Sequence, residues 1–285
     1  KRQDDLSNGS SFNIAEFQNK STFKFIKGDI KDITTLGKIF VDHMDIVYHL
    51  AAEINVQKSI DLPGYTFEND VIGTFNVLEM CRKYGVKMLF MSTCMVYDRC
   101  SDNKGINETH PTKPASPYAA CKLSGEALTL SYYHAYGLPT VVVRPFNTYG
   151  PYQKTTGEGG VVAIFSKRML EGKSLQIYGD GSQTRDLMYV EDCADFVIKA
   201  GESKEVNGDI INAGTGRDVS INELANMVSR GKVGIEHVPH IHPQSEIARL
   251  LCDNSKAKRM LNWQPRVSLE EGIERTIDWI KGAED

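Results

Sequence analysis

The stretch YTFENDVIGTFNVLEMCRKYGVKMLFMST, residues 65–93, decides the fold. Its first part has apolar residues at helical spacing and ends at Tyr84-Gly85, where a glycine can adopt the left-handed conformation that closes a helix. Its second part, KMLFMST, is a continuous apolar run with the length of a buried strand. A helix followed at once by a buried strand predicts one repeat of a parallel α/β sheet.

The same alternation continues on both sides of this stretch. The segments that carry it are FKFIKGDI (23–30), DIVYHLAA (45–52), SPYAACKLSGEALTLSYYHAYG (116–137) and TVVVRPF (140–146). We therefore predict an α/β fold with a Rossmann-type, doubly wound parallel sheet over residues 1–150. Beyond residue 150, a glycine-rich loop, short apolar runs and further helical segments predict a smaller C-terminal α+β lobe over 151–285, and we expect the two lobes to interleave.

Composition excludes several classes of protein. The chain has 285 residues, of which 41% are hydrophobic and 25% charged, and a formal net charge of −4. No basic stripe for nucleic acid and no apolar run of membrane length is present, so we expect neither partner. The six cysteines form no CxxC pair and no signal peptide is visible, which makes the cytoplasm, with reduced thiols, the expected location.

The start of the chain departs from the usual dinucleotide-binding pattern. It begins at KRQDDLSNGS, without the strand, GxGxxG turn and helix that normally hold a pyrophosphate. Either this βα unit is missing from the sequence or the protein is not a working enzyme, and we expect missing residues. Asp4 stands where an acidic side chain accepts adenosine ribose hydroxyls, which favours NAD over NADP. A solvated turn or helix cap is the alternative for Asp4.

Tyr118 and Lys122 are spaced to form a base. Four residues apart on a helix, they lie on one face, and a cation near a tyrosine lowers the phenol pKa from about 10 toward the working pH. The resulting phenolate can take a proton from a sugar hydroxyl. The alternative is a tyrosine ring that packs while the lysine extends to solvent.

Taken in order, the motifs resemble one family. They are DDLSNG, KGDI, VYHLAA, ENDVIGTFNVLE, MSTCMVYD, SPYAACK, RPFNTYGP, YGDGSQTRDLMYVED and DNSKAKRMLNWQP. This series resembles the nucleotide-sugar epimerases and dehydratases of the extended short-chain dehydrogenase/reductase superfamily. The resemblance implies an NAD-binding lobe over 1–150 and a lobe over 151–285 that binds a nucleoside diphosphate sugar, with UDP favoured.

The resemblance also implies roles for individual residues. The residues implied to contact NAD are Asp4, Asp29, Ile30, Leu50, Ala51, Ala52, Asn69, Tyr118, Lys122, Pro145 and Phe146. Thr93 matches the hydroxyl that bonds the sugar O4 beside Tyr118. In this family Tyr118 removes the O4 proton while C4 passes a hydride to NAD, which leaves a 4-keto sugar. Ordinary strand-end packing and helix capping are the alternatives for these positions.

Cys94 and Met95 depart from the hexose 4,6-dehydratases, in which an Asp-Glu pair follows the threonine. Met95 cannot transfer a proton, but a thiol near a cation could be partly ionised, so we expect Cys94 to take part in catalysis. This substitution resembles the branch that acts on UDP-N-acetylglucosamine, with tunicamycin-type 5,6-dehydratases and the oxidase/5-epimerases of nonulosonic acid pathways. An inert, buried cysteine is the alternative.

For the nucleotide sugar, the resemblance implies that Asn147 and Arg185 meet the phosphates and the nucleotide, as guanidinium geometry allows. A surface ion pair with Asp186 is the alternative for Arg185. His242 stands where relatives have a pyrophosphate-binding arginine, and Arg249 is its possible substitute. The histidines near residue 240 lack metal-ligand spacing, so we predict no metal site.

Three functions remain open from the sequence. The first is an NAD-dependent enzyme that oxidises C4 of a UDP-N-acetylhexosamine and then works at C5 and C6, and we favour it. The second is a 4-epimerase in which Cys94 is structural, and the third is a non-catalytic nucleotide-sugar or dinucleotide sensor. The resemblance further implies a homodimer in which the Tyr118 helix and the 68–80 helix form a four-helix bundle.

Overall fold

The computed structural model describes residues 1–40, 43–100, 104–156, 160–240 and 247–284. It divides into two compact units. The first unit comprises Lys1–Ser92, Ser116–Val142 and Asn207–Asp209, and the second comprises Thr93–Ala115, Val143–Val206 and Ile210–Asp285. The units therefore interleave along the chain, and the second contains more residues than the first. A smaller C-terminal lobe is not confirmed by this division.

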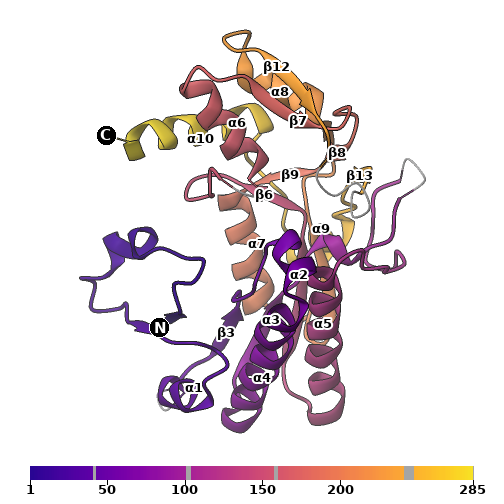
Figure 1. Cartoon of the computed structure of the whole chain (residues 1–285). Helices are drawn as coiled ribbons and strands as arrows, with labels where there is room; N and C mark the ends of the chain where they lie inside the picture. The colour runs from indigo at the N-terminus through magenta and orange to yellow at the C-terminus, as the bar shows by residue number, and fades with distance from the viewer. Residues whose placement is uncertain (41–42, 101–103, 157–159, 241–246, 285) are drawn as a thin grey trace. The chain divides into compact units, whose positions relative to one another are not determined.

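The first unit alternates helices and strands as predicted (Figure 1). Its elements are β1 (Arg2–Asp4), η1 (Ser11–Phe17), β2 (Phe25–Lys27), α1 (Ile33–Ile39), β3 (Ile46–His49), α2 (Val56–Asp61), α3 (Pro63–Phe67), η2 (Glu68–Ile72), α4 (Gly73–Tyr84), β4 (Lys87–Met91) and α5 (Pro117–Tyr136). β1 pairs with β2, and β3 pairs with β4, in both cases in parallel. With β5 (Thr140–Pro145) and β10 (Asp209–Ala213), a four-stranded sheet has the order β10-β5-β4-β3. The predicted Rossmann-type parallel α/β fold is thus confirmed.

The β1-β2 pair is separate from the four-stranded sheet. A cavity of about 500 Å³ is lined by the whole of β1 and the whole of β3, together with residues of α1. Tyr48 of β3 is 38% exposed. The edge of β3 that is not paired with β4 therefore borders an open slot in the first unit.

The two long helices begin and end for the reasons expected from the sequence. Ser116 caps α5 by accepting a hydrogen bond from the Ala119 amide, and Pro117 occupies the first helical position. Gly85 after α4 and Gly137 after α5 have φ values of +67° and +66°, which only glycine adopts without strain.

The predicted 65–85 helix differs in its middle, where η2 is a π-helical turn between α3 and α4. The Gly73 amide bonds the Glu68 carbonyl, and the Thr74 hydroxyl donates to the Asp70 carbonyl at 2.5 Å. A Cβ on Gly73 would lie 2.4 Å from Ile30 Cδ1, so glycine permits close packing at this point. Such single π turns often occur at functional sites.

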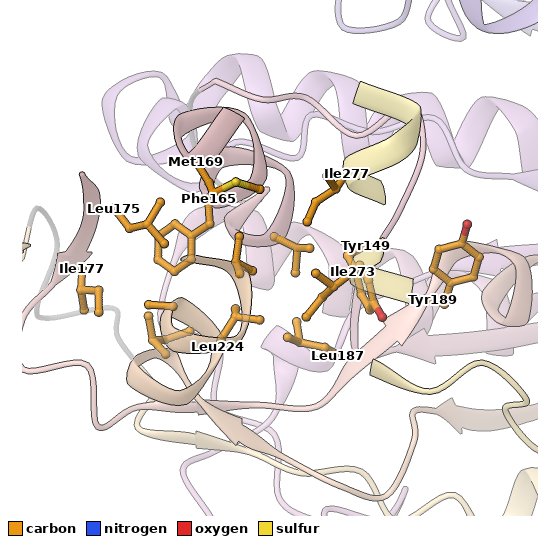
Figure 2. Close-up of a cluster of buried hydrophobic side chains, with 14 residues drawn as sticks. Tyr149, Phe165, Met169, Leu175, Ile177, Leu187, Tyr189, Leu224, Ile273 and Ile277 are labelled. Atoms are coloured by element: carbon orange, nitrogen blue, oxygen red, sulfur yellow. The ribbon is translucent and has the colours of Figure 1, made fainter. Parts of the chain in front are cut away.

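The second unit has its own core (Figure 2). Its elements are η3 (Cys94–Val96), β6 (Asn147–Tyr149), α6 (Val161–Leu170), β7 (Leu175–Tyr178), β8 (Thr184–Arg185), β9 (Leu187–Tyr189), α7 (Val190–Glu202), β11 (Val219–Ser220), α8 (Ile221–Ser229), β12 (Ile235–Val238), β13 (Arg249–Leu250), α9 (Ser255–Leu261) and α10 (Leu269–Glu284). Phe165 of α6, Leu224 of α8 and Ile273 of α10 are fully or almost fully buried in one cluster. Burial of such side chains contributes about 1.5–3 kcal/mol each before entropy is counted.

All six cysteines lie in the described part of the chain, and none forms a disulfide. Among the described helices, none combines the length and the apolar character needed to cross a membrane.

Candidate functional site

One cavity in the first unit collects most of the residues predicted to contact the cofactor. It has a volume of about 260 Å³ and is lined at the ends of β1, β2 and β3. The predicted residues in its wall are Asp4, Asp29, Ile30, Leu50, Ala51, Ala52 and Asn69. They come together because the carboxyl ends of β1, β2 and β3 and the beginning of η2 border the same cavity, although β1 and β2 pair apart from the sheet that contains β3. Strand ends of this kind are where α/β folds bind ligands.

The acceptor and the apolar side chains of this cavity fit the adenosine half of a dinucleotide. Asp4 Oδ1 accepts the Leu6 amide at 2.8 Å, which leaves carboxylate lone pairs for ribose hydroxyls, although Arg2 lies 3.2 Å from Oδ2. Leu50 and Ile54 are 50% and 54% exposed, so they offer apolar surface to a base. A Cβ on Gly9 would lie 3.0 Å from Asp4 Oδ1, so glycine keeps the approach to this carboxylate open.

Several cavity residues were not predicted from the sequence. They are Gln3, Asp5, Ser7, Asn8, Gly9, Gly28 and Ile54. The glycines were the available signal, because Gly28 directly follows β2, and a glycine at a strand end often marks a close approach to the backbone.

Tyr118 and Lys122 lie in the first turn and a half of α5, both buried, with 8% and 4% exposure. The Tyr118 amide donates to Ser59 Oγ at 3.1 Å. Lys122 Nζ donates to the Met91 carbonyl at 2.9 Å and lies 5.2 Å from the centre of the Phe90 ring. The lysine therefore does not extend to solvent, and the predicted alternative of a solvent-extended lysine is wrong.

Charged groups gather around Lys122. Burial lowers the pKa of its ammonium, whereas Asp70 and then Glu126 oppose this shift. Burial also lowers the pKa of His49, to about 3, so this ring is neutral at physiological pH. Glu126 accepts a short hydrogen bond from Ser92, which follows β4. The end of β4 is thus held by two side chains of α5.

Thr93 and Cys94 belong to the second unit, at the start of η3. The Thr93 hydroxyl accepts the Met95 amide at 3.2 Å and so caps this short helix. Cys94 is 2% exposed, and burial raises the pKa of its thiol to about 12. The prediction of a partly ionised Cys94 thiol is therefore wrong, because desolvation outweighs the nearby Arg185 charge and leaves a neutral thiol.

Pro145, Phe146 and Asn147 also lie in the second unit. Phe146 is 2% exposed, and its amide donates to the Ala213 carbonyl at 2.8 Å. Asn147 Oδ1 is buried and has no hydrogen-bond partner among the described residues. A buried amide of this kind is suited to a ligand, so the substrate role of Asn147 stays a prediction.

The two predicted arginines point away from each other. In the sheet β11-β8-β13, Arg249 pairs with Thr184, so Arg185 faces the opposite side. Arg249 Nε bonds Asp218 at 2.9 Å, whereas Arg185 Nη1 donates to the Thr184 and Ile247 carbonyls. Asp218 therefore neutralises Arg249, and the two arginines do not form one phosphate site within this sheet.

The ion-pair alternative for Arg185 concerns Asp186. The Asp186 carboxylate accepts the amides of Thr215, Gly216 and Cys252 and the Thr215 hydroxyl. This fully buried aspartate therefore anchors backbone rather than serving as a surface partner. His242 lies outside the described residues.

Comparisons with known proteins identify the relatives of the chain. Residues 1–276 match the family model described as GDP-mannose 4,6 dehydratase. A UDP-glucose 4-epimerase of Mycolicibacterium smegmatis is 37% identical over 98% of this chain and 89% of its own length. The chain is also similar to the solved structure of Pal from Bacillus thuringiensis, at 60% identity and a TM-score of 0.97, over 99% of this chain and 90% of Pal.

A third relative is the UDP-N-acetylglucosamine 4-epimerase of Methanobrevibacter ruminantium M1, solved with UDP-N-acetylmuramic acid. It is 30% identical with a TM-score of 0.90, over 99% of this chain and 90% of its own. Other solved structures of this fold contain bound NAD.

Proposed function

Because the chain belongs to the GDP-mannose 4,6 dehydratase family, we propose that it oxidises C4 of a UDP-N-acetylhexosamine and then acts at C5 and C6. The members of this family are NAD-dependent nucleotide-sugar epimerases and dehydratases of the extended short-chain dehydrogenase type. The buried Tyr118-Lys122 pair on α5 is the observation that carries this proposal. A non-catalytic sensor has no need of such a pair.

At C4, the residues of this chain handle the proton. The Tyr118 phenolate accepts the O4 proton, the Lys122 ammonium offsets the phenolate charge, and the Thr93 hydroxyl orients the sugar hydroxyl. NAD, when bound, supplies the reversible hydride acceptor. Since Thr93 and Tyr118 belong to different compact units, their cooperation in one site is part of the proposal.

A ketone at C4 acidifies the hydrogen at C5, so groups near C5 decide the product. We assign Cys94 the role of proton donor in this second step, because it follows Thr93 at the position where the hexose 4,6-dehydratases have an acid-base pair, and its thiol is protonated at physiological pH. The UDP-N-acetylhexosamine substrate is supported by the relative solved with UDP-N-acetylmuramic acid and by the Cys94-Met95 pair. His242, Arg185 and Asn147 remain candidates for the phosphates.

The test is turnover in heavy water. The purified enzyme is incubated with UDP-N-acetylglucosamine, UDP-N-acetylgalactosamine and their 6-deoxy and 5,6-unsaturated derivatives, and products are analysed by NMR and mass spectrometry. We expect deuterium at C5 or loss of one water molecule. Interconversion at C4 with protium retained at C5 contradicts the proposal.

A 4-epimerase is the second candidate, and the raised pKa of Cys94 favours it. A fully buried neutral thiol is what a structural cysteine looks like. In this case Tyr118 and Thr93 are sufficient, since the keto sugar rotates before the hydride returns. The heavy-water experiment separates the two candidates.

A homodimer is proposed for the helical face of the first unit. α4 packs against α5 (Figure 1). Exposed apolar side chains lie on α4 and on the two elements before it. Phe67 of α3, Ile72 of η2 and Phe75 of α4 are 50%, 42% and 42% exposed. Apolar surface of this kind is typical of an interface, and a second copy of the chain is the proposed partner.

A further inference from the structure

Asp70 is a buried carboxylate with an unused oxygen. It is 2% exposed, and its Oδ1 accepts the Glu53 amide at 2.7 Å and the Asn69 side-chain amide at 3.3 Å. Its Oδ2 is buried and has no hydrogen-bond partner among the described residues. A buried acceptor without a partner costs about 1–3 kcal/mol of folding stability, so the unpaired Oδ2 of Asp70 needs a physical reason.

The position of Asp70 in the fold offers a physical reason for the unpaired oxygen. Asp70 lies in the π turn η2, which packs against α5, the helix of Tyr118 and Lys122. On its other side, Asn69 lines the cavity described above and Glu53 follows Ala52 of the same cavity wall. The π turn therefore places the carboxylate between this wall and the helix of the proposed base.

Lys122 lacks a salt-bridge partner within 4 Å among the described ion pairs, although it is buried. The hydrogen bond that its Nζ donates within the described part of the chain goes to a neutral carbonyl, that of Met91. A buried ammonium without opposite charge loses its proton readily, because desolvation favours the neutral amine. The phenolate of Tyr118, however, needs the charged form.

Among the described residues, four titratable groups from the surrounding elements interact electrostatically with Lys122. Asp70 comes from η2, Glu126 and Cys121 from α5, and His49 from β3. His49 and Cys121 are neutral, because burial lowers the pKa of the first to about 3 and raises that of the second to about 11. Glu126 already binds the Ser92 hydroxyl. Asp70 is left as the carboxylate whose Oδ2 has no hydrogen-bond partner among the described residues. Burial raises the pKa of Asp70, whereas the charge of Lys122 opposes this shift.

We propose that Asp70 is a positioning residue whose negative charge holds Lys122 in the ammonium form across the buried contact between η2 and α5. The proposal for Asp70 rests on the proposed function only in taking the Tyr118-Lys122 pair as the catalytic base. Asp70 touches no reacting atom in this scheme. It acts through Lys122, and the π turn aims its carboxylate.

The test removes the negative charge of Asp70 and keeps the shape of its side chain. In Asp70→Asn the amide oxygen still accepts the Glu53 amide, so the fold is retained while the charge is lost. The protein is labelled with 13Cε-lysine, the Lys122 signal is assigned by its loss in Lys122→Arg, and the midpoint of its pH titration is measured. We expect the midpoint to fall by about one pH unit in Asp70→Asn.

The matched control is Glu68→Gln, which removes the same charge from an exposed position of the same turn. It should leave the Lys122 midpoint unchanged. In kinetics, Asp70→Asn should move the alkaline limb of the kcat profile to lower pH by a similar amount, with an unaltered KM for the sugar nucleotide.

An unchanged midpoint in Asp70→Asn overturns the proposal, as does an equal shift in Glu68→Gln. A kcat that is lowered equally at every pH, with the midpoint unmoved, assigns Asp70 a structural role only. If Asp70→Asn does not fold, Asp70→Ser is also neutral and can accept the Glu53 amide. Because the titration needs no turnover, its outcome is independent of whether the reaction has been assigned correctly.

Discussion

Lys122 and Met91 are joined by a hydrogen bond in which the Nζ ammonium donates to the backbone carbonyl at 2.9 Å. This bond ties helix α5 to the last residue of β4. Met91 stands two residues before Thr93. The lysine that we propose to support Tyr118 therefore also holds the end of the strand that leads to the proposed sugar-binding hydroxyl. The Ser92-Glu126 bond adds a second tie at the neighbouring residue.

Tyr118→Phe should abolish hydride transfer. The substitution removes only the ionisable oxygen, and loss of a general base typically costs 10²- to 10⁴-fold in rate. Binding of UDP-N-acetylglucosamine, measured by calorimetry, should remain within about twofold of the wild-type value, since the ring still fills its place. Turnover near the wild-type rate would remove Tyr118 from the mechanism.

Local signals predicted the elements well. Tyr84-Gly85 and Tyr136-Gly137 predicted two helix ends, and both glycines adopt positive φ. Most of the predicted cavity residues came from the family resemblance, and they mainly follow strand ends, where α/β folds bind ligands. The apolar pattern through residues 65–84 could not show the π turn, because one extra residue per turn hardly alters a short helical period.

The charges around Lys122 were not predictable for a different reason. Asp70 and Glu126 are far apart in sequence, and their approach depends on how η2 and α5 pack. The pKa of Cys94 was predicted in the wrong direction, because sequence does not report burial. Arg185 favours the thiolate and Asp186 opposes it, but desolvation is the largest effect and raises the pKa.

Cys94→Ser separates the two candidate functions. A serine keeps the size of the side chain but is a much weaker acid than a thiol, so the C5/C6 step should slow by at least about 100-fold if Cys94 donates the proton. Oxidation at C4, followed as single-turnover formation of NADH absorbance, should be nearly unchanged. Full retention of C5 deuteration in this variant would show that the cysteine is structural.

His49 should make the protein less stable in acid. Burial lowers its folded-state pKa to about 3, whereas an unfolded histidine titrates near 6.5. The unfolded chain therefore binds a proton that the folded chain excludes, and stability is lost as pH falls from about 6.5 toward 3.

Urea unfolding at pH 7.5 and pH 5 measures this effect of His49. We expect a loss of about 2 kcal/mol from this residue alone, estimated from the pKa difference. His49→Gln can still bond the Thr74 hydroxyl, which lies 2.9 Å from the ring nitrogen, but does not titrate. An equal loss in His49→Gln would assign the pH dependence to other groups.

Gly125 permits α5 to approach β4. A Cβ at this position would lie 2.5 Å from Cζ of Phe90, a core side chain that is 1% exposed. Gly125→Ala should therefore destabilise the protein by about 1–3 kcal/mol through overpacking. Gly37→Ala is the control, because a Cβ in α1 meets nothing within 4 Å and should stabilise by about 0.5–1 kcal/mol. Equal effects of the two changes in urea unfolding would contradict this packing argument.

Phe75→Glu should convert the proposed homodimer to monomers. Phe75 is 42% exposed on α4, and a charge buried at the centre of an apolar interface without a partner costs several kcal/mol, enough to shift a dimer dissociation constant by orders of magnitude. Ile198→Glu introduces the same charge at a 50% exposed position of α7 and should leave the mass unchanged.

Sedimentation equilibrium of both variants, with circular dichroism to check folding, measures the result. A wild-type mass near the 31.8 kDa of one chain rules out the dimer, and a dimeric Phe75→Glu protein places the interface on another face.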